Sequence, residues 1–270
     1  MALFFSISQL QAHYDIIAIG SGYGGSVNAS RLARTRKSDG PNVRICVLEQ
    51  GKEIPTGEFP NSVTSALPAF QMDSPVGHVG ERNSLYHVHY QDDISVFTGC
   101  ALGGTSQVNA NVSLNADERL FTKEMGWPKA LVDDLNEGLA QGFERALEML
   151  ALIAYPENYP RLHKHASLQN LAAKLGAADK CKLTSINVSF KDGLNRVGIH
   201  QPACNGCGDC VSGCNLGSKG TLTKNYIPDA HNHGAEFYCS LDVRHVLRHS
   251  NGWAVYFQPV GCHRDTFQCH

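Results

Sequence analysis

Three glycines near the start of the chain have the spacing of a phosphate-binding turn. Gly20, Gly22 and Gly25 form the pattern G-x-G-x-x-G. The first glycine permits a tight turn, the second lets the backbone approach a phosphate closely, and the third lets a helix lie against a strand. Glu49 follows 24 residues after Gly25, where a second strand would present a carboxylate to a ribose diol. The spacing predicts a site for a dinucleotide, and NADP is disfavoured because Glu49 would repel its 2′-phosphate.

A second cluster of small residues begins at Gly103 and includes Gly104 and Ser106. Consecutive small residues let the backbone pass close to a flat or bulky ligand, and the amides of Asn109 and Asn111 can supply hydrogen bonds. The alternative is an ordinary tight turn that caps a helix. Beside the first motif, we favour a loop that contacts the cofactor.

Four cysteines form a third pattern, C-x2-C-x2-C-x3-C, at Cys204, Cys207, Cys210 and Cys214. This is the spacing of bacterial-type ferredoxins, although Asn215 stands where those proteins have proline. The pattern leaves three interpretations open: a [4Fe–4S] cluster, a zinc ion held by thiolates, or a reduced loop without metal.

The elements that would position these motifs are typical of an α/β fold. The apolar pattern predicts a strand over residues 16–19, which leads into the glycines, and a helix over residues 26–37. It also predicts a second buried strand over residues 43–48, just before Glu49. This order predicts a three-layer, Rossmann-like dinucleotide-binding domain. Residues 51–80 show little periodicity and predict a long covering loop or insertion.

Periodicity predicts further elements along the chain. The expected strands are residues 85–90, 94–97, 184–190, 243–247 and 253–258, the last two joined by a turn at Asn251-Gly252. The expected helices are residues 129–152, with one apolar stripe, and 168–175, capped by Ser167 and closed by Gly176.

Composition narrows the class of protein. Apolar residues make up 42% of the chain, charged residues 18%, and the net charge is -2, so nothing favours nucleic acid or an anionic membrane as a partner. No stretch has the apolar length of a membrane span. The apolar start is short and lacks a basic segment, so we expect no signal peptide and a cytoplasmic location.

The motifs together resemble the glucose–methanol–choline (GMC) oxidoreductases, and the cholesterol-oxidase-like branch fits best. The resemblance rests on the glycine turn, Glu49-Gln50-Gly51, the stretch 103–109 and the stretch 219–226. It implies FAD as the cofactor and oxidation of a sterol or another bulky or long-chain alcohol, with oxygen or another electron acceptor. The cofactor-binding residues that it implies are Gly20, Gly22, Tyr23, Gly24 and Gly25 at the pyrophosphate, Glu49 and Gln50 at the adenosine ribose, Gly103, Gly104, Ser106 and Asn109 along the pyrophosphate and flavin, and the backbone of Val243 near the adenine.

The resemblance also implies a division of the chain. Residues 12–125 would form an FAD-binding core with covering loops, 126–200 an insertion on the substrate side, and 201–270 a Cys-rich loop followed by a β-rich return to the core. Members of the family are longer and carry their catalytic histidine near the C-terminus. We therefore expect a truncated chain with an incomplete second domain, and we assign no catalytic residue.

The histidines match no family motif. We expect them at the surface or in loops, at His87, His89, His163, His165, His231, His233, His245, His249 and His263, and we expect no role for Cys262 or Cys269. Two other functions stay open: an iron–sulfur flavoprotein dehydrogenase that passes electrons to a carrier, and a non-catalytic dinucleotide-binding remnant.

Overall fold

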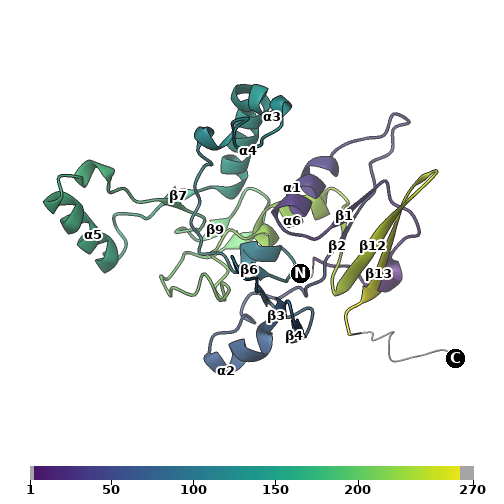
Figure 1. Cartoon of the computed structure of the whole chain (residues 1–270), viewed down its shortest axis with the longest axis horizontal. Helices are drawn as coiled ribbons and strands as arrows, with labels where there is room; N and C mark the ends of the chain where they lie inside the picture. Colours follow the sequence, from purple (N-terminus) through teal and green to yellow (C-terminus); the bar gives the residue numbers. More distant parts are fainter. Residues whose placement is uncertain (1–2, 262–270) are drawn as a thin grey trace.

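The centre of the molecule is a three-stranded parallel sheet whose middle strand is covered on both faces. A computed structural model describes residues 3–261, and the predictions made for Cys262, His263 and Cys269 lie outside this range. Strands β1 (Ile16–Ile19), β2 (Ile45–Leu48) and β11 (Glu236–Tyr238) pair in the order β1-β2-β11. Helices α1 (Tyr23–Leu32) and α6 (Tyr226–Asn232) pack together beside this sheet (Figure 1).

The two faces of β2 belong to two different apolar clusters, and this makes the core three-layered. Ile45 and Val47 pack with residues of α1 and α6, whereas Cys46 and Leu48 pack with the hairpin of β12 (Leu241–His249) and β13 (Gly252–Pro259). All four residues of β2 are buried, as expected for a parallel strand covered on both sides. The predicted three-layer α/β fold is confirmed.

A polar contact inside the helical layer ties α1 to α6. Asp229 is buried and accepts a hydrogen bond from the Ser30 hydroxyl at 2.5 Å, and it pairs with the guanidinium of Arg34. Burial by itself raises the pKa of Asp229, but the Arg34 and Ser30 contacts outweigh burial and hold this pKa below its usual value. A charged side chain is thereby accommodated next to the core.

A second sheet forms from the segment predicted to be a loop. Residues 51–80 contain α2 (Val63–Ala66), β3 (Phe70–Ser74) and β4 (Gly77–Val79), so the prediction of a loop is wrong, while that of an insertion stays a prediction. These strands join β5 (Tyr86–His89) and β6 (Val96–Gly99) in the order β4-β3-β5-β6. Strands β3 and β5 are parallel, and this pairing of non-adjacent strands leaves no signal in local periodicity.

The helical region between the sheets is less regular than predicted. Residues 129–152 form α3 (Lys129–Asp133), a π-helical turn (Leu135–Leu139) and α4 (Ala140–Leu150) instead of one helix. The Asp134 carboxylate accepts the Gly138 amide at 2.9 Å, and this local contact competes with regular α-helix. Helix α5 (His163–Lys174) begins four residues before Ser167, so Ser167 is not its cap.

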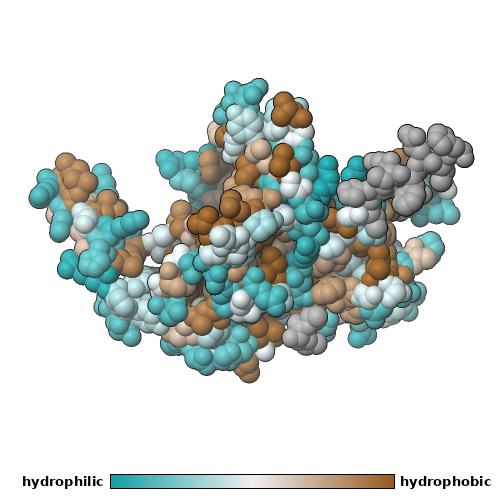
Figure 2. All heavy atoms as spheres, turned by 90° about the horizontal axis from the view of Figure 1, so that it is seen from below, coloured by the Kyte–Doolittle hydropathy of each residue, from teal (hydrophilic) through white to brown (hydrophobic). Residues whose placement is uncertain are grey.

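The helices α3, α4 and α5 project from the core in Figure 1, and α5 stands at the end of an extended arm. The strand predicted over residues 184–190 is reduced to β8 (Ser185–Ile186), which pairs with β7 (Ile153–Ala154) at the base of this arm. Figure 2 shows apolar side chains at the surface of the arm, where Leu168, Leu171 and Leu175 are exposed.

The predicted hairpin near the end of the described chain is confirmed. Strands β12 and β13 are antiparallel, and His249 pairs with Gly252, so Ser250 and Asn251 form the two-residue connection, one residue earlier than the predicted turn at Asn251-Gly252. The remaining short elements are β9 (Gly193–Leu194), β10 (His200–Gln201) and the 3-10 turns Ile7–Gln9, Leu67–Ala69, Gly104–Gln107, Glu118–Leu120, Ala178–Lys180 and Leu222–Lys224. Over residues 3–261, every helix is too short or too polar to cross a bilayer.

Candidate functional site

The glycine turn between β1 and α1 has the geometry that its sequence predicts. Gly20 adopts a φ of +87°, which favours glycine, and its amide donates to the Leu48 carbonyl at 2.7 Å. A Cβ on Gly25 would collide with the Gly20 carbonyl oxygen, so only glycine lets α1 come this close to the turn. Gly20 and Gly25 thus shape the turn.

The N-terminus of α1 is free to receive a ligand. Gly22 is the N-cap residue, no side chain caps the helix, and no acidic residue lies in its first turn. The first amides of a helix have no partner within it and carry partial positive charge. A Cβ on Gly22 or Gly24 would meet no atom within 4 Å, so the space beside these amides is open. The turn suits an anionic group such as a phosphate.

The second glycine loop lies directly against the first. A Cβ on Gly104 would come within 2.9 Å of the Gly22 Cα, and the Gly103 amide donates to the Ser21 hydroxyl at 2.9 Å. Gly103 and Gly104 have φ values of +93° and +55°. Two segments about 80 residues apart in sequence are therefore joined by contacts that require glycine.

Polar side chains fix the position of this second loop. The Ser106 hydroxyl donates to the Gly103 carbonyl at 2.6 Å and accepts from the Leu222 amide at 3.1 Å. The Asn109 amide donates to the hydroxyl of Tyr23, in the first turn of α1, at 2.9 Å. The predicted residues Ser106, Asn109 and Tyr23 are thus brought to the same place as the glycines.

The Glu49 carboxylate faces the glycine turn. It is only 6% exposed, and one of its oxygens accepts from the Ser21 amide at 2.8 Å and from the Ser21 hydroxyl at 2.6 Å. The other oxygen accepts from the Gly51 amide at 2.8 Å. A carboxylate has about four acceptor positions, so three donors leave about one for a ribose hydroxyl. Gln50, the next residue, is partly buried.

Val243 occupies a different layer from the glycine loops. It lies on β12, where its side chain packs against the cluster of Leu48, Tyr238 and Leu241. The strand register shifts between Val243 and His245, which marks a bulge. The predicted backbone contact of Val243 with adenine stays a prediction.

Lys219 begins the stretch 219–226 that contributed to the resemblance, but no role was predicted for its side chain. The residue is 2% exposed, and its ammonium donates to the carbonyls of Gln107 at 3.1 Å, Asn109 at 2.7 Å and Cys210 at 2.8 Å. Burial lowers the pKa of Lys219 to about 8. Lys219 thereby ties the second glycine loop to the Cys-rich loop.

The four clustered cysteines surround one small cavity together with Val188 and Lys219. All four thiols are free. Within residues 3–261, no three of them bring their sulfur atoms within 4.8 Å of one another, so the predicted zinc alternative finds no preformed site. Burial raises the pKa of the Cys210 thiol. No observation supports an iron–sulfur cluster.

Within residues 3–261, no histidine is among the residues that form the glycine site. The expectation that the histidines lie at the surface or in loops is wrong for four that are partly buried in helices or strands: His87, His89, His165 and His231. His87 and His89 lie on β5, in the middle of the second sheet, and both are partly buried. Their alternating pattern in the sequence indicated the strand. Their polar partner is distant in sequence and gave no signal.

Comparison with known proteins places the chain in a family. It belongs to the GMC oxidoreductases, whose N-terminal domain matches residues 11–265. A cholesterol oxidase of Mycobacterium tuberculosis is 28% identical over 260 residues, which are 91% of this chain and 42% of that protein. A cholesterol oxidase of Acinetobacter baumannii is 26% identical over 274 residues, 94% of this chain and 45% of that protein. The predicted family is confirmed.

More distant similarities extend to other oxidases. A long-chain-alcohol oxidase of Arabidopsis thaliana is 22% identical over 246 residues, 88% of this chain and 27% of that protein. A fungal aryl-alcohol oxidase structure matches over 93% of this chain and 43% of its own chain, with 13% identity and a TM-score of 0.43. The chain spans less than half the length of each of these relatives.

Proposed function

We propose that this chain forms the FAD-binding part of an alcohol oxidoreductase. The observation that supports this most strongly is the contact between the two glycine segments at the uncapped N-terminus of α1. One segment offers helix amides to a phosphate, and the other supplies a backbone without side chains beside it. Membership of the GMC oxidoreductases makes FAD the dinucleotide that this surface would hold.

Each predicted residue has a role in this proposal. The pyrophosphate would lie against Gly20, Gly22, Tyr23, Gly24 and Gly25, with Gly103, Gly104, Ser106 and Asn109 along the pyrophosphate and flavin, Glu49 and Gln50 at the adenosine ribose, and the Val243 backbone near the adenine. The pre-existing donors to Glu49 hold its carboxylate in place, so little side-chain freedom is lost on binding.

The chemistry that FAD supplies when bound is acceptance of a hydride from the carbon of an alcohol. The residues described here bind and orient, and we assign none of them to proton transfer. The names of the relatives favour a sterol or a long-chain alcohol as substrate and oxygen as the electron acceptor. These finer assignments concern the whole protein and are part of the proposal.

The test is replacement of Gly22 by alanine. Gly22 has a φ of −63°, which alanine adopts easily, and its added methyl group would meet no protein atom within 4 Å. The methyl group would occupy the space through which a phosphate approaches the helix amides. We expect Gly22→Ala to keep the unfolding temperature of the wild type and to weaken FAD binding at least tenfold, measured by quenching of flavin fluorescence.

Gly142→Ala is the matched control, because Gly142 also has open space around its missing Cβ but lies on α4. It should bind FAD as the wild type does. Equal FAD affinity in all three proteins would contradict the proposed site. A wild-type protein that binds no FAD would favour a non-catalytic remnant, and a broad visible absorption that is sensitive to reductants would favour the iron–sulfur alternative.

A further inference from the structure

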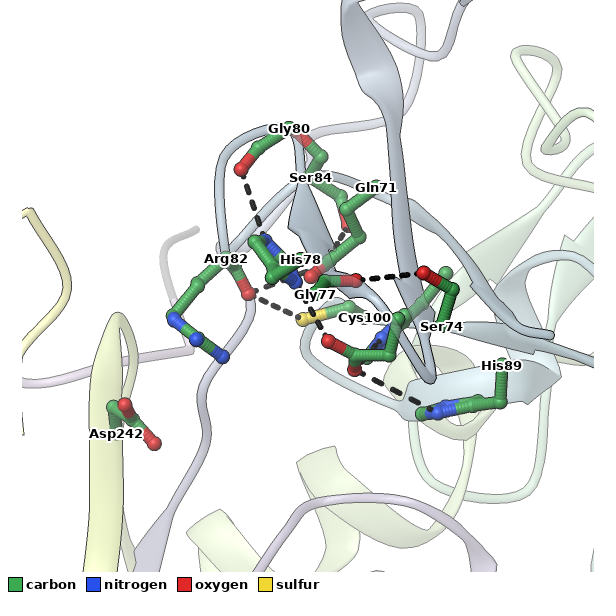
Figure 3. A network of polar contacts seen from close by, with 12 residues as sticks. Gln71, Ser74, Gly77, His78, Gly80, Arg82, Ser84, His89, Cys100 and Asp242 are labelled. Carbon is green, nitrogen blue, oxygen red and sulfur yellow. Dashed lines mark hydrogen bonds and ion pairs between the residues drawn. The ribbon is translucent and has the colours of Figure 1, made fainter. Parts of the chain in front are cut away.

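A cluster of histidines and one aspartate lies on the second sheet, away from the glycine loops. Asp73 is on β3, and His87 and His89 are on β5 (Figure 3 shows His89 and its neighbours). Asp73 pairs with His89 in the parallel register of β3 and β5. His87 precedes His89 by two residues and therefore projects from the same face of the sheet. The strand register brings all three side chains together.

The ligand atoms of these residues have the spacing of a metal site. One nitrogen from each histidine and one carboxylate oxygen all lie within 4.8 Å of one another. The Asp73 Oδ2 atom is 2.7 Å from His87 Nε2 and 3.8 Å from His89 Nδ1. Tetrahedral zinc with bonds of 2.0–2.1 Å separates its ligand atoms by about 3.3 Å. Small side-chain rotations would therefore admit an ion among them.

Neighbouring groups hold the ligands in place. The Nε2 atom of His89 lies 3.3 Å from the Thr98 hydroxyl, which leaves Nδ1 to face Asp73. The second oxygen of Asp73 is 2.7 Å from Nδ1 of His78, whose Nε2 is 2.9 Å from the Gly80 carbonyl. Outer contacts of this kind orient metal ligands and fix the tautomer of their imidazole rings.

The cluster is accessible from solvent. The side chains of Asp73 and His89 are 40% and 39% exposed, whereas that of His87 is 12% exposed. An ion could enter from solvent and keep a water molecule as a further ligand.

We propose that Asp73, His87 and His89 bind a divalent transition-metal ion, with zinc as the preferred ion. Two imidazoles and one carboxylate form a donor set that zinc accepts, and the open side leaves a fourth position for water. This site would link β3 to β5. It shares no residue with the glycine loops, although β6, which carries Thr98, leads to the second loop, where the Gly99 amide donates to the Thr105 hydroxyl at 3.2 Å.

The experiment is a zinc titration of the purified whole chain against a chromophoric indicator. We expect the wild type to bind one zinc ion and His89→Gln to lower the zinc affinity by at least about 100-fold. Loss of an outer contact to a metal ligand alone typically lowers metal affinity 10–100-fold, and His89 would be a ligand itself. The control is His200→Gln, since His200 also contacts a carboxylate, that of Asp192 at 3.0 Å, but in an exposed pair outside the cluster. It should bind zinc as the wild type does.

Cobalt distinguishes this site from the cysteines, because a thiolate ligand gives an intense charge-transfer band in the near ultraviolet. We expect the cobalt complex to lack this band. Asp73→Asn, which keeps the size of the side chain, should also lose the site, and circular dichroism should show that both variants stay folded without metal. Zinc affinity that is unchanged in both variants, equal loss in the control, or a thiolate band would each overturn the proposal.

Discussion

Replacing Lys219 by methionine should loosen the second glycine loop from the Cys-rich loop. Methionine keeps much of the length of the side chain but removes its charge and its three donors. The carbonyls of Gln107, Asn109 and Cys210 would then remain buried near an apolar side chain without the ammonium. The loop that carries Gly103 would lose its main polar anchor.

The magnitude follows from two opposing contributions. A hydrogen bond to a charged group contributes about 1.5–3 kcal/mol, so three such bonds contribute about 4.5–9 kcal/mol. Burial of the charge costs about 3 kcal/mol, since the pKa of Lys219 falls from 10.5 to about 8 and each pH unit corresponds to about 1.36 kcal/mol. We therefore expect Lys219→Met to lower the free energy of unfolding by about 2–6 kcal/mol.

The destabilisation caused by Lys219→Met should increase with pH. The pKa of Lys219 is lower in the folded chain than in the unfolded chain, so the folded lysine loses its proton first and the cost of burying its charge disappears between pH 8 and 10.5. The free energy of unfolding of the wild type should therefore rise by about 2 kcal/mol relative to that of Lys219→Met between pH 7 and pH 9.5. The buried thiols of Cys46 and Cys100, whose pKa values are raised to about 12, affect both proteins equally.

The assay is urea unfolding followed by circular dichroism at both pH values, with hydrogen exchange of the amides in residues 103–109. Lys224→Met is the control: burial also lowers the pKa of Lys224, but its ammonium donates to a single hydroxyl, that of Thr56, at 3.2 Å. The reasoning would be refuted if Lys219→Met unfolded at the urea concentration of the wild type, or if the control were equally unstable.

Two further predictions concern the packing of α1. Gly25→Ala should destabilise the fold by several kcal/mol in thermal unfolding, since the added Cβ collides with the carbonyl of Gly20, whereas Gly24→Ala, with open space, should change stability by less than about 1 kcal/mol. Asp229→Asn should cost about 2 kcal/mol at pH 7, because it removes the charged acceptor of the Ser30 hydroxyl and the charged partner of Arg34, whose side chain is 39% exposed. The pKa of Asp229 is lowered in the folded state, so its contribution to the free energy of unfolding is present above pH 3.8 and is lost as the pH falls below 3.8. The unfolding free energies of the wild type and of Asp229→Asn, measured at decreasing pH, should therefore become equal in acid.

Local sequence patterns predicted the parts of the site that are made of consecutive residues. The turn at Gly20 and the hairpin of β12 and β13 follow from glycine spacing and from alternation, which act over a few residues. The sheet of β3 and β5 was not predicted, because its pairing joins separate segments. The partners of Lys219 and the contact of Asp73 with His89 could not be predicted for the same reason: they join segments that are distant in sequence. Strand register and loop contacts are set by tertiary packing.

Strand β1, which leads into the glycine turn, is also an edge of the central sheet. Over residues 3–261 it pairs with β2 alone, and Ile17 and Ile19 are 36% and 53% exposed. Unpaired amides and carbonyls beside exposed isoleucines form a template on which another extended segment can add as a strand. Any strand added there would stiffen the residues before Gly20 and so affect how strongly the turn holds a phosphate. Self-association and cofactor affinity of this chain should therefore change together.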